Sequence, residues 1–236
     1  MKKLTLLTFF MTFALISCST EEIESEQQTK HLNRTSKEVA HNSNNPYDYV
    51  GKAFGDVLLA YENANFSEND AIAIKENMQS IANAHPNFAA LNPSGQFVIA
   101  DSQMITNMIN GTYDIENAMN AAAFTENAKV KIVSFMNHLK TQIENQPVSS
   151  VFNSIVVFEN SVLNQDNLTS ADVRLILSTT SILRFINSYH LNENSEKEWS
   201  KTNTCITASL YGFSTAGETQ GILAAAVVSV LQDNNN

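Results

Sequence analysis

The chain has 236 residues, with 14 lysines and arginines against 24 aspartates and glutamates, and its formal net charge is −10. Charged residues make up 16% of the chain, well under the roughly 25% of an average domain. Asparagine takes the place of charge, since 29 residues are Asn, while a hydrophobic content of 43% excludes disorder throughout the chain. The acidic balance argues against nucleic acid as a partner, because neutralising phosphates needs a stripe of lysine and arginine.

The N-terminus has the features of a bacterial lipoprotein signal peptide. Lys2 and Lys3 precede the uncharged residues 4–16, a stretch too short to span a bilayer as a stable helix. The end of this stretch continues into Ser17 and Cys18, and residues 15–18 have the sequence LISC, which resembles a lipobox. The resemblance implies that residues 1–17 are removed and that Cys18 carries a lipid anchor to the membrane. An ordinary secretory signal with an accidental cysteine is the alternative.

Residues 18–44 are predicted to be the lipidated cysteine and a flexible, acidic and polar tether. Four glutamates follow Cys18 closely, namely Glu21, Glu22, Glu24 and Glu26. This cluster resembles the surface-export tag of Bacteroidetes lipoproteins, although a solvated tether explains it equally well. We therefore expect an outer-membrane lipoprotein, with the periplasmic and the cell-surface face both left open.

From residue 45 onward, apolar residues recur at the three- and four-residue spacing of helices. Asn45 and Pro46 suit a helix start and predict a helix over 46–64, with Val50 and Phe54 on its apolar face. Two further helices are predicted to begin with a capping box, one at Ser67 with Asp70 and one at Thr169 with Asp172, the second of which runs to about residue 190. Three others are predicted from Asp101 to Gly111, over 115–122, and from Thr125 to Pro147. A loop is predicted around 85–95.

These patterns together predict an all-α fold, a single irregular helical bundle over residues 45–236. No regular alternation of apolar and polar residues is longer than Gln96–Ala100, which argues against a substantial sheet. Residues 148–158 are rich in β-branched side chains, so a strand remains open there.

The C-terminal segment from Cys205 to Leu231 contains one charged residue, Glu218. We predict a helical hairpin packed in the core and broken near residues 214–217, because a membrane span would have to bury Glu218. Gly217, Gly221, Ala225 and Ser229 form a possible helix-packing row, since small residues at every fourth position let another helix approach closely. Gly51 and Gly55 have the same spacing near the start of the domain.

The sequence has no recognisable catalytic or metal-binding motif. The five histidines, at positions 31, 41, 85, 138 and 190, have no second ligand at metal-binding spacing. Cys205 is interpreted as a small buried hydrophobe rather than a nucleophile, and Glu144 and Glu159 as single carboxylates facing solvent. We therefore predict no catalytic residue, no metal site and no cofactor.

The start of the predicted domain, Asn45-Pro46-Tyr47-Asp48-Tyr49-Val50-Gly51, resembles the NPYDxxG opening of small uncharacterised Bacteroidetes lipoproteins. Some members of that group are labelled bacteriocin-like because of a Gly/Ala-rich end, and residues 217–229 are similar. In that group a His-Asn pair follows the glycine by three residues, where this chain has Phe54 and Gly55. A role resting on that pair is therefore not carried over.

Three functions remain open at this point. The first is a non-enzymatic, envelope-anchored lipoprotein whose helical domain binds an unknown envelope protein or ligand. The second is a membrane-active, bacteriocin-like protein that uses its Gly/Ala-rich C-terminal segment. The third is an enzyme with a site assembled from scattered carboxylates, amides and histidines. An exposed C-terminal helix would favour the second, and a pocket with converging polar groups would favour the third.

Overall fold

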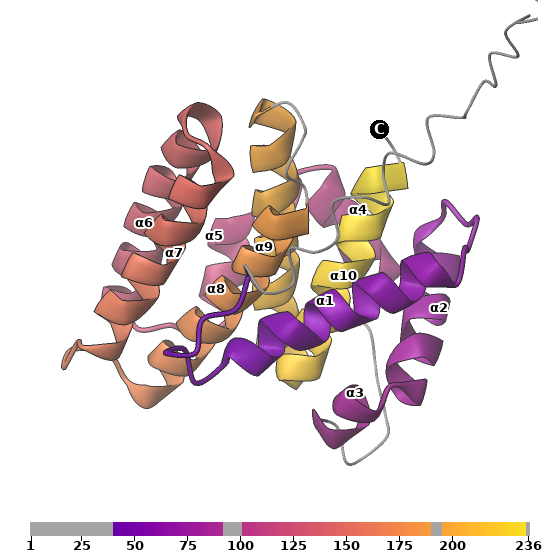
Figure 1. Ribbon diagram of the computed structural model, residues 1–236, viewed down its shortest axis with the longest axis horizontal. Coiled ribbons are helices and arrows are strands. Elements are labelled where there is room, and N and C mark those ends of the chain that lie inside the picture. The colour runs from indigo at the N-terminus through magenta and orange to yellow at the C-terminus, as the bar shows by residue number, and fades with distance from the viewer. Residues whose placement is uncertain (1–39, 92–100, 190–194, 235–236) are drawn as a thin grey trace, which may run out of the picture. The chain divides into compact units, whose positions relative to one another are not determined.

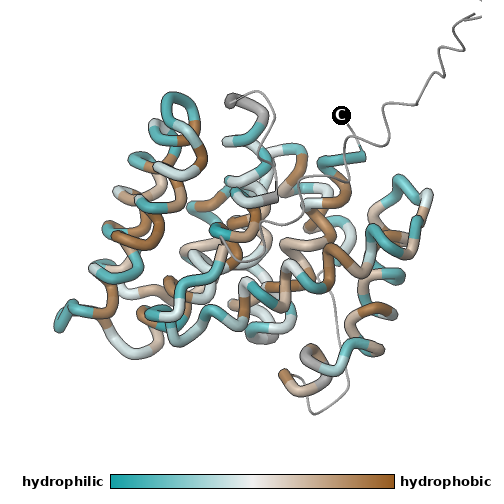
Figure 2. The backbone as a smooth tube through the Cα atoms, viewed as in Figure 1, coloured by the Kyte–Doolittle hydropathy of each residue, from teal (hydrophilic) through white to brown (hydrophobic). Residues whose placement is uncertain are grey.

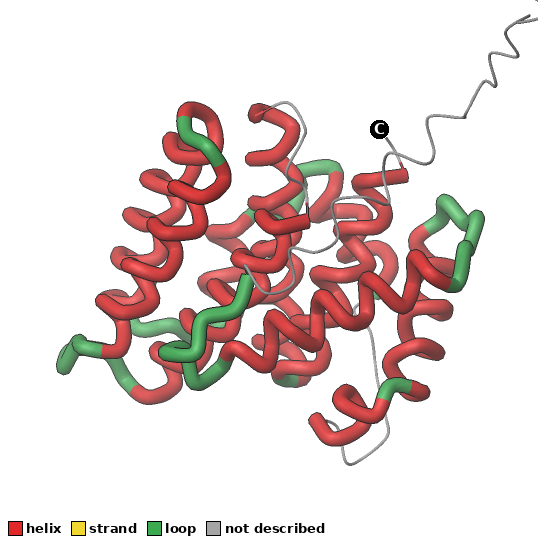
Figure 3. The backbone as a smooth tube through the Cα atoms, in the orientation of Figure 1, coloured by secondary structure: helices red, strands yellow, loops and turns green. Residues whose placement is uncertain are grey.

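The computed structural model describes residues 40–91, 101–189 and 195–234. These residues form ten helices and no strand, which confirms the predicted all-α class (Figure 1, Figure 3). They belong to one compact unit, Ser36–Asn236. The predicted lipobox with Cys18, the glutamate cluster, His31 and His190 lie outside the described residues.

The bounds of the helices are α1 Asp48–Asn63, α2 Ala71–Ala84, α3 Pro86–Leu91, α4 Ser102–Ile109, α5 Ile115–Ala121, α6 Glu126–Asn145, α7 Val148–Leu163, α8 Ser170–Tyr189, α9 Ser195–Ala216 and α10 Glu218–Asn234. Residues 148–158 lie within α7, so the strand left open there does not form. α3 lies in the region predicted as a loop, because Pro86 suits the first turn of a helix.

Capping side chains set the starts of α4, α6 and α8 where the sequence predicts them. Asp101 and Thr125 accept backbone hydrogen bonds from the first turns of α4 and α6. The capping box of Asp172 with Thr169 is confirmed, since each side chain accepts a hydrogen bond from the other residue's backbone N–H. At α2 the prediction needs one correction, because Asp70 alone is the cap and accepts from two backbone N–H groups.

Two helices, α8 and α10, lie inside the bundle. Every residue of α10 from Thr219 to Leu231 is buried, with α9, α1 and α2 packed around it. Cys205 on α9 is fully buried in the same hydrophobic cluster, and this burial raises the pKa of its thiol. The predicted hairpin is therefore observed, and Cys205 is the buried hydrophobe that the sequence indicates.

The predicted small-residue row is observed only in part. Gly221, Ala225 and Ser229 are buried on α10, and a Cβ atom on Gly221 would lie 2.4 Å from the Phe213 ring of α9. Gly217 instead connects α9 to α10 with φ +88°, and a Cβ atom there would meet no atom within 4 Å. Its inclusion in the row was wrong, because it ends one helix rather than packing against another.

The glycines of α1 allow a close approach to α8. A Cβ atom on Gly51 would lie 2.4 Å from the carbonyl oxygen of Ser181, and one on Gly55 would meet the Phe185 ring at 2.8 Å. The backbone N–H of Gly51 also donates a hydrogen bond of 2.9 Å to the Ser181 hydroxyl. Small residues at these positions therefore bring the first helix directly onto the central helix α8.

Among the described residues, no helix is both long enough and apolar enough to cross a membrane.

Candidate functional site

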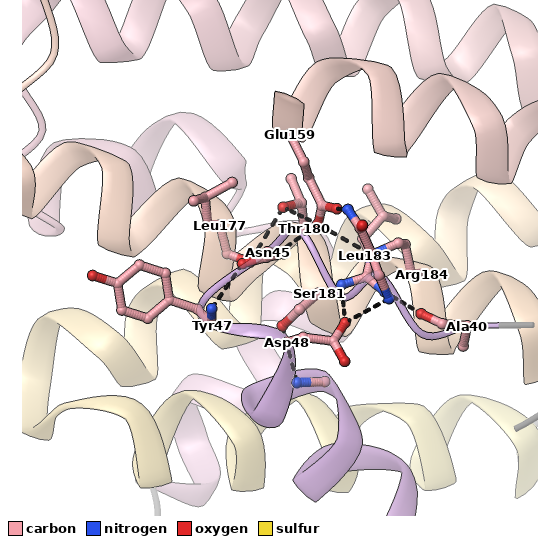
Figure 4. A network of polar contacts seen from close by, with 12 residues as sticks. Ala40, Asn45, Tyr47, Asp48, Glu159, Leu177, Thr180, Ser181, Leu183 and Arg184 are labelled. Atoms are coloured by element: carbon pink, nitrogen blue, oxygen red, sulfur yellow. Dashed lines mark hydrogen bonds and ion pairs between the residues drawn. The ribbon is translucent and has the colours of Figure 1, made fainter. Parts of the chain in front are cut away.

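A buried network of charged residues joins the start of α1 to α7 and α8 (Figure 4). Its centre is Arg184, which is fully buried and whose Nε donates a hydrogen bond of 3.1 Å to Glu159 Oε1. The guanidinium also donates to the carboxylate of Asp48 and to the backbone carbonyl of Ala40. Arg184 thus carries the positive charge between two buried carboxylates.

Glu159 is fully buried, so the prediction that it faces solvent was wrong. It lies on the same face of α7 as Val151 and Ile155, and that face packs on α8. Three neutral donors complete its hydrogen bonding: the side-chain amides of Asn42 at 2.6 Å and Asn45 at 2.8 Å, and the Thr180 hydroxyl at 2.8 Å. With Arg184 included, four donors occupy the two carboxylate oxygens. The arrangement is that of a structural ion pair whose polar atoms are satisfied.

The network moves the start of the folded part from residue 45 to at least residue 40. Ala40 and Asn42 are buried, although the sequence places both in the tether. Asn45 does not cap α1 as predicted, because its amide binds Glu159 and its Oδ1 accepts from the backbone N–H of Tyr47. His41, also assigned to the tether, has an exposed side chain whose Nδ1 contacts the Asp48 carboxylate.

An open groove of about 770 Å³ lies on the hairpin of α6 and α7. Its lining contains uncharged polar, apolar and basic side chains, namely Asn127, Val130, Lys131, Ser134, Phe135, His138, Asn153, Ser154, Val157, Phe158, Ser161, Gln165 and Asn167. Hydrophobic and hydrophilic segments alternate along this hairpin in Figure 2. The groove therefore offers hydrogen-bonding groups and apolar surface side by side.

Two stacked aromatic rings line the groove. Phe135 and Phe158 face each other with ring centroids 3.8 Å apart and an interplanar angle of 7°. Lys131 Nζ lies over the Phe158 ring, 5.5 Å from its centroid, and burial lowers the pKa of this lysine. Val130 and Val157 are 69% and 67% exposed, the two highest values among the exposed large hydrophobic residues of the described chain.

The groove and the buried network lie on different sides of α7 and share no residue. His138 lines the groove with an exposed side chain, while His85 follows the end of α2. None of the predicted small-residue row reaches the groove. In the described ranges, no group of three or more His, Cys, Asp and Glu residues could hold a metal ion.

Comparison with protein-family models, with curated proteins and with solved structures found no significant match.

Proposed function

We propose that this chain is an envelope lipoprotein, anchored in the outer membrane through Cys18, and that its helical domain is a non-enzymatic binding module. The groove of α6 and α7 is the proposed binding site. The observation that carries this proposal is the lining of the groove, where the exposed Val130 and Val157 lie among serine and amide side chains. A concave surface that combines apolar contact area with a few hydrogen-bonding groups is typical of binding sites.

The buried network supports a structural rather than a catalytic role for the charged residues of α7 and α8. A general acid or base must reach a substrate within hydrogen-bond distance. Glu159 and Arg184 are fully buried, and the donors around Glu159 already come from the chain itself. The groove, in contrast, is lined by exposed polar side chains such as Ser134 and His138.

The membrane-active alternative draws no support from the C-terminal helix. That function needs an apolar segment that can leave the domain, whereas α10 is buried over 219–231 and packs against several helices. Releasing it would expose the hydrophobic cluster that it shares with α1, α2 and α9.

The lipid anchor is tested by replacing Cys18. In the lipoprotein pathway only a thiol accepts the diacylglycerol, so Cys18→Ser is expected to leave an uncut precursor without acyl groups. Intact-mass spectrometry of the membrane-extracted wild type and variant measures both properties. An unmodified wild-type chain that begins at another residue would show that the predicted cleavage and lipidation at Cys18 are wrong.

The binding site is tested by placing a charge in the groove. Val157→Glu puts a carboxylate where a partner would bury a methyl surface, so it is expected to reduce retention of an envelope partner at least tenfold. The measurement is quantitative co-purification of the lipidated protein from its own envelope. Val133→Glu is the matched control, because Val133 is 43% exposed on α6 but does not line the groove. Equal loss in both variants would contradict the assignment of the site.

A further inference from the structure

The charge of the groove indicates which ligands suit it. The chain carries 24 acidic against 14 basic residues, yet none of the lining residues is Asp or Glu. The only lining residues able to carry charge are Lys131 and His138, and both are basic. An anion therefore meets less repulsion here than over the acidic remainder of the chain.

Lys131 differs from its neighbours on α6. Lys129 pairs with Glu126 at 3.0 Å, and Lys140 pairs with Glu144 at 3.9 Å. Lys131 has no carboxylate at ion-pair distance within the described residues, and its ammonium lies over an aromatic ring instead. Burial disfavours its charged form, and no nearby charge offsets that effect. An anionic group bound beside Nζ would provide the missing partner.

The rest of the lining suits a hydrocarbon chain attached to that anionic group. Val130 and Val157 expose methyl groups to water, and covering them with hydrocarbon is favourable. Ser134 lines the same groove and carries a hydroxyl that can donate a hydrogen bond to an anionic head group, whereas the Ser161 hydroxyl donates to the backbone carbonyl of Phe158 at 2.7 Å.

A saccharide fits this lining less well. Sugar rings stack on exposed aromatic faces, but Phe135 covers one face of Phe158 at 3.8 Å and Lys131 lies over the ring. A bound sugar would have to displace the lysine, whereas an anion would bind beside it.

We infer that the groove binds an amphipathic organic anion, with its anionic head group at Lys131 and its hydrocarbon chain along Val130 and Val157. This inference rests on the proposed function, because it names the ligand class of the proposed binding site.

The test is isothermal titration calorimetry of residues 19–236, which contain the whole compact unit, with decanoate below its micelle concentration and with decanol as its neutral counterpart. Decanoate is expected to bind at least tenfold more tightly than decanol. Lys131→Met should remove this preference, and Val157→Asn should lower the affinity for both ligands about fivefold. The matched controls Lys129→Met and Val133→Asn should stay within twofold of the wild type, and thermal melts verify that each variant is folded.

The inference is overturned if decanol binds as tightly as decanoate, if Lys129→Met weakens decanoate as much as Lys131→Met, or if decanoate gives no saturable binding. Saturable binding of maltose without decanoate binding would also overturn it and assign the groove to saccharides. If decanoate fails while Val157→Glu still abolishes partner retention and Val133→Glu does not, the ligand class is wrong and the groove remains the binding site. If decanoate fails and Val157→Glu also leaves partner retention unchanged, the proposed function fails as well.

Discussion

Replacing Arg184 by Leu is expected to lower the free energy of unfolding by about 3–5 kcal/mol, the typical cost of removing one partner of a buried ion pair. Arg184 and Glu159 are fully buried, and Asp48 is 6% exposed. The variant would leave both carboxylates in the interior without their cation. Urea unfolding followed by circular dichroism at 222 nm measures the loss directly.

The matched control is Arg174→Leu on the same helix. Arg174 pairs with Glu218 at 2.8 Å, but its side chain is 57% exposed, so water and salt screen the pair. The expected loss is about 0–1 kcal/mol. An Arg184→Leu variant that loses no more than this control would show that the buried network contributes little to the stability of the fold.

Gly221→Leu is expected to lower the free energy of unfolding by about 1–3 kcal/mol. The melting temperature should fall by about 2–10 °C, measured by circular dichroism on the lipid-free chain. The reason is that even a Cβ atom at this position would lie 2.4 Å from the Phe213 ring. Neither the wild type nor the variant is expected to release dye from anionic or zwitterionic vesicles, because α10 stays inside the domain.

Ser200→Leu is the control for Gly221→Leu, since it adds the same side chain on an exposed position of α9. It should change the melting temperature by less than about 2 °C, because surface substitutions are usually small in effect. Dye release by the wild type at sub-micromolar concentration, together with an unchanged melt of Gly221→Leu, would favour the membrane-active function instead.

The helices could be predicted from the sequence because their signals are local. Stripes such as Val50, Phe54 and Val57 report a buried face within a few turns, and caps such as Asp101 and Thr125 mark helix starts. Residues 148–158 were ambiguous because β-branched side chains occur in both strands and buried helices. Packing of Val151 and Ile155 against α8 decides in favour of the helix.

The buried network could not be predicted, because its partners are distant in sequence. Asn42 and Glu159 are 117 residues apart, and Arg184 is 25 residues beyond Glu159. From the sequence, a single charged residue on a helix is therefore predicted to face solvent. One feature of the sequence does indicate that Glu159 is buried, because it follows Ile155 by four residues and therefore lies on the same buried helix face.

The groove was missed for a different reason. Val130 and Val157 lie outside the apolar stripes that define the core faces of α6 and α7, and a single valine outside a stripe is normally unremarkable. Their significance depends on the antiparallel pairing of the two helices, which brings Phe135 against Phe158. That pairing is a tertiary property. The sequence therefore contains the residues of the groove but does not show that they lie together.

The position of Ala40 affects how the domain would respond to mechanical force. Its carbonyl oxygen is bonded to Arg184, and Asn42, two residues later, is bonded to Glu159. A pull on the chain before residue 40 would have to break these bonds before any force reached α1. This end of the domain should therefore resist stretching more than a helix end that is not bonded to the interior.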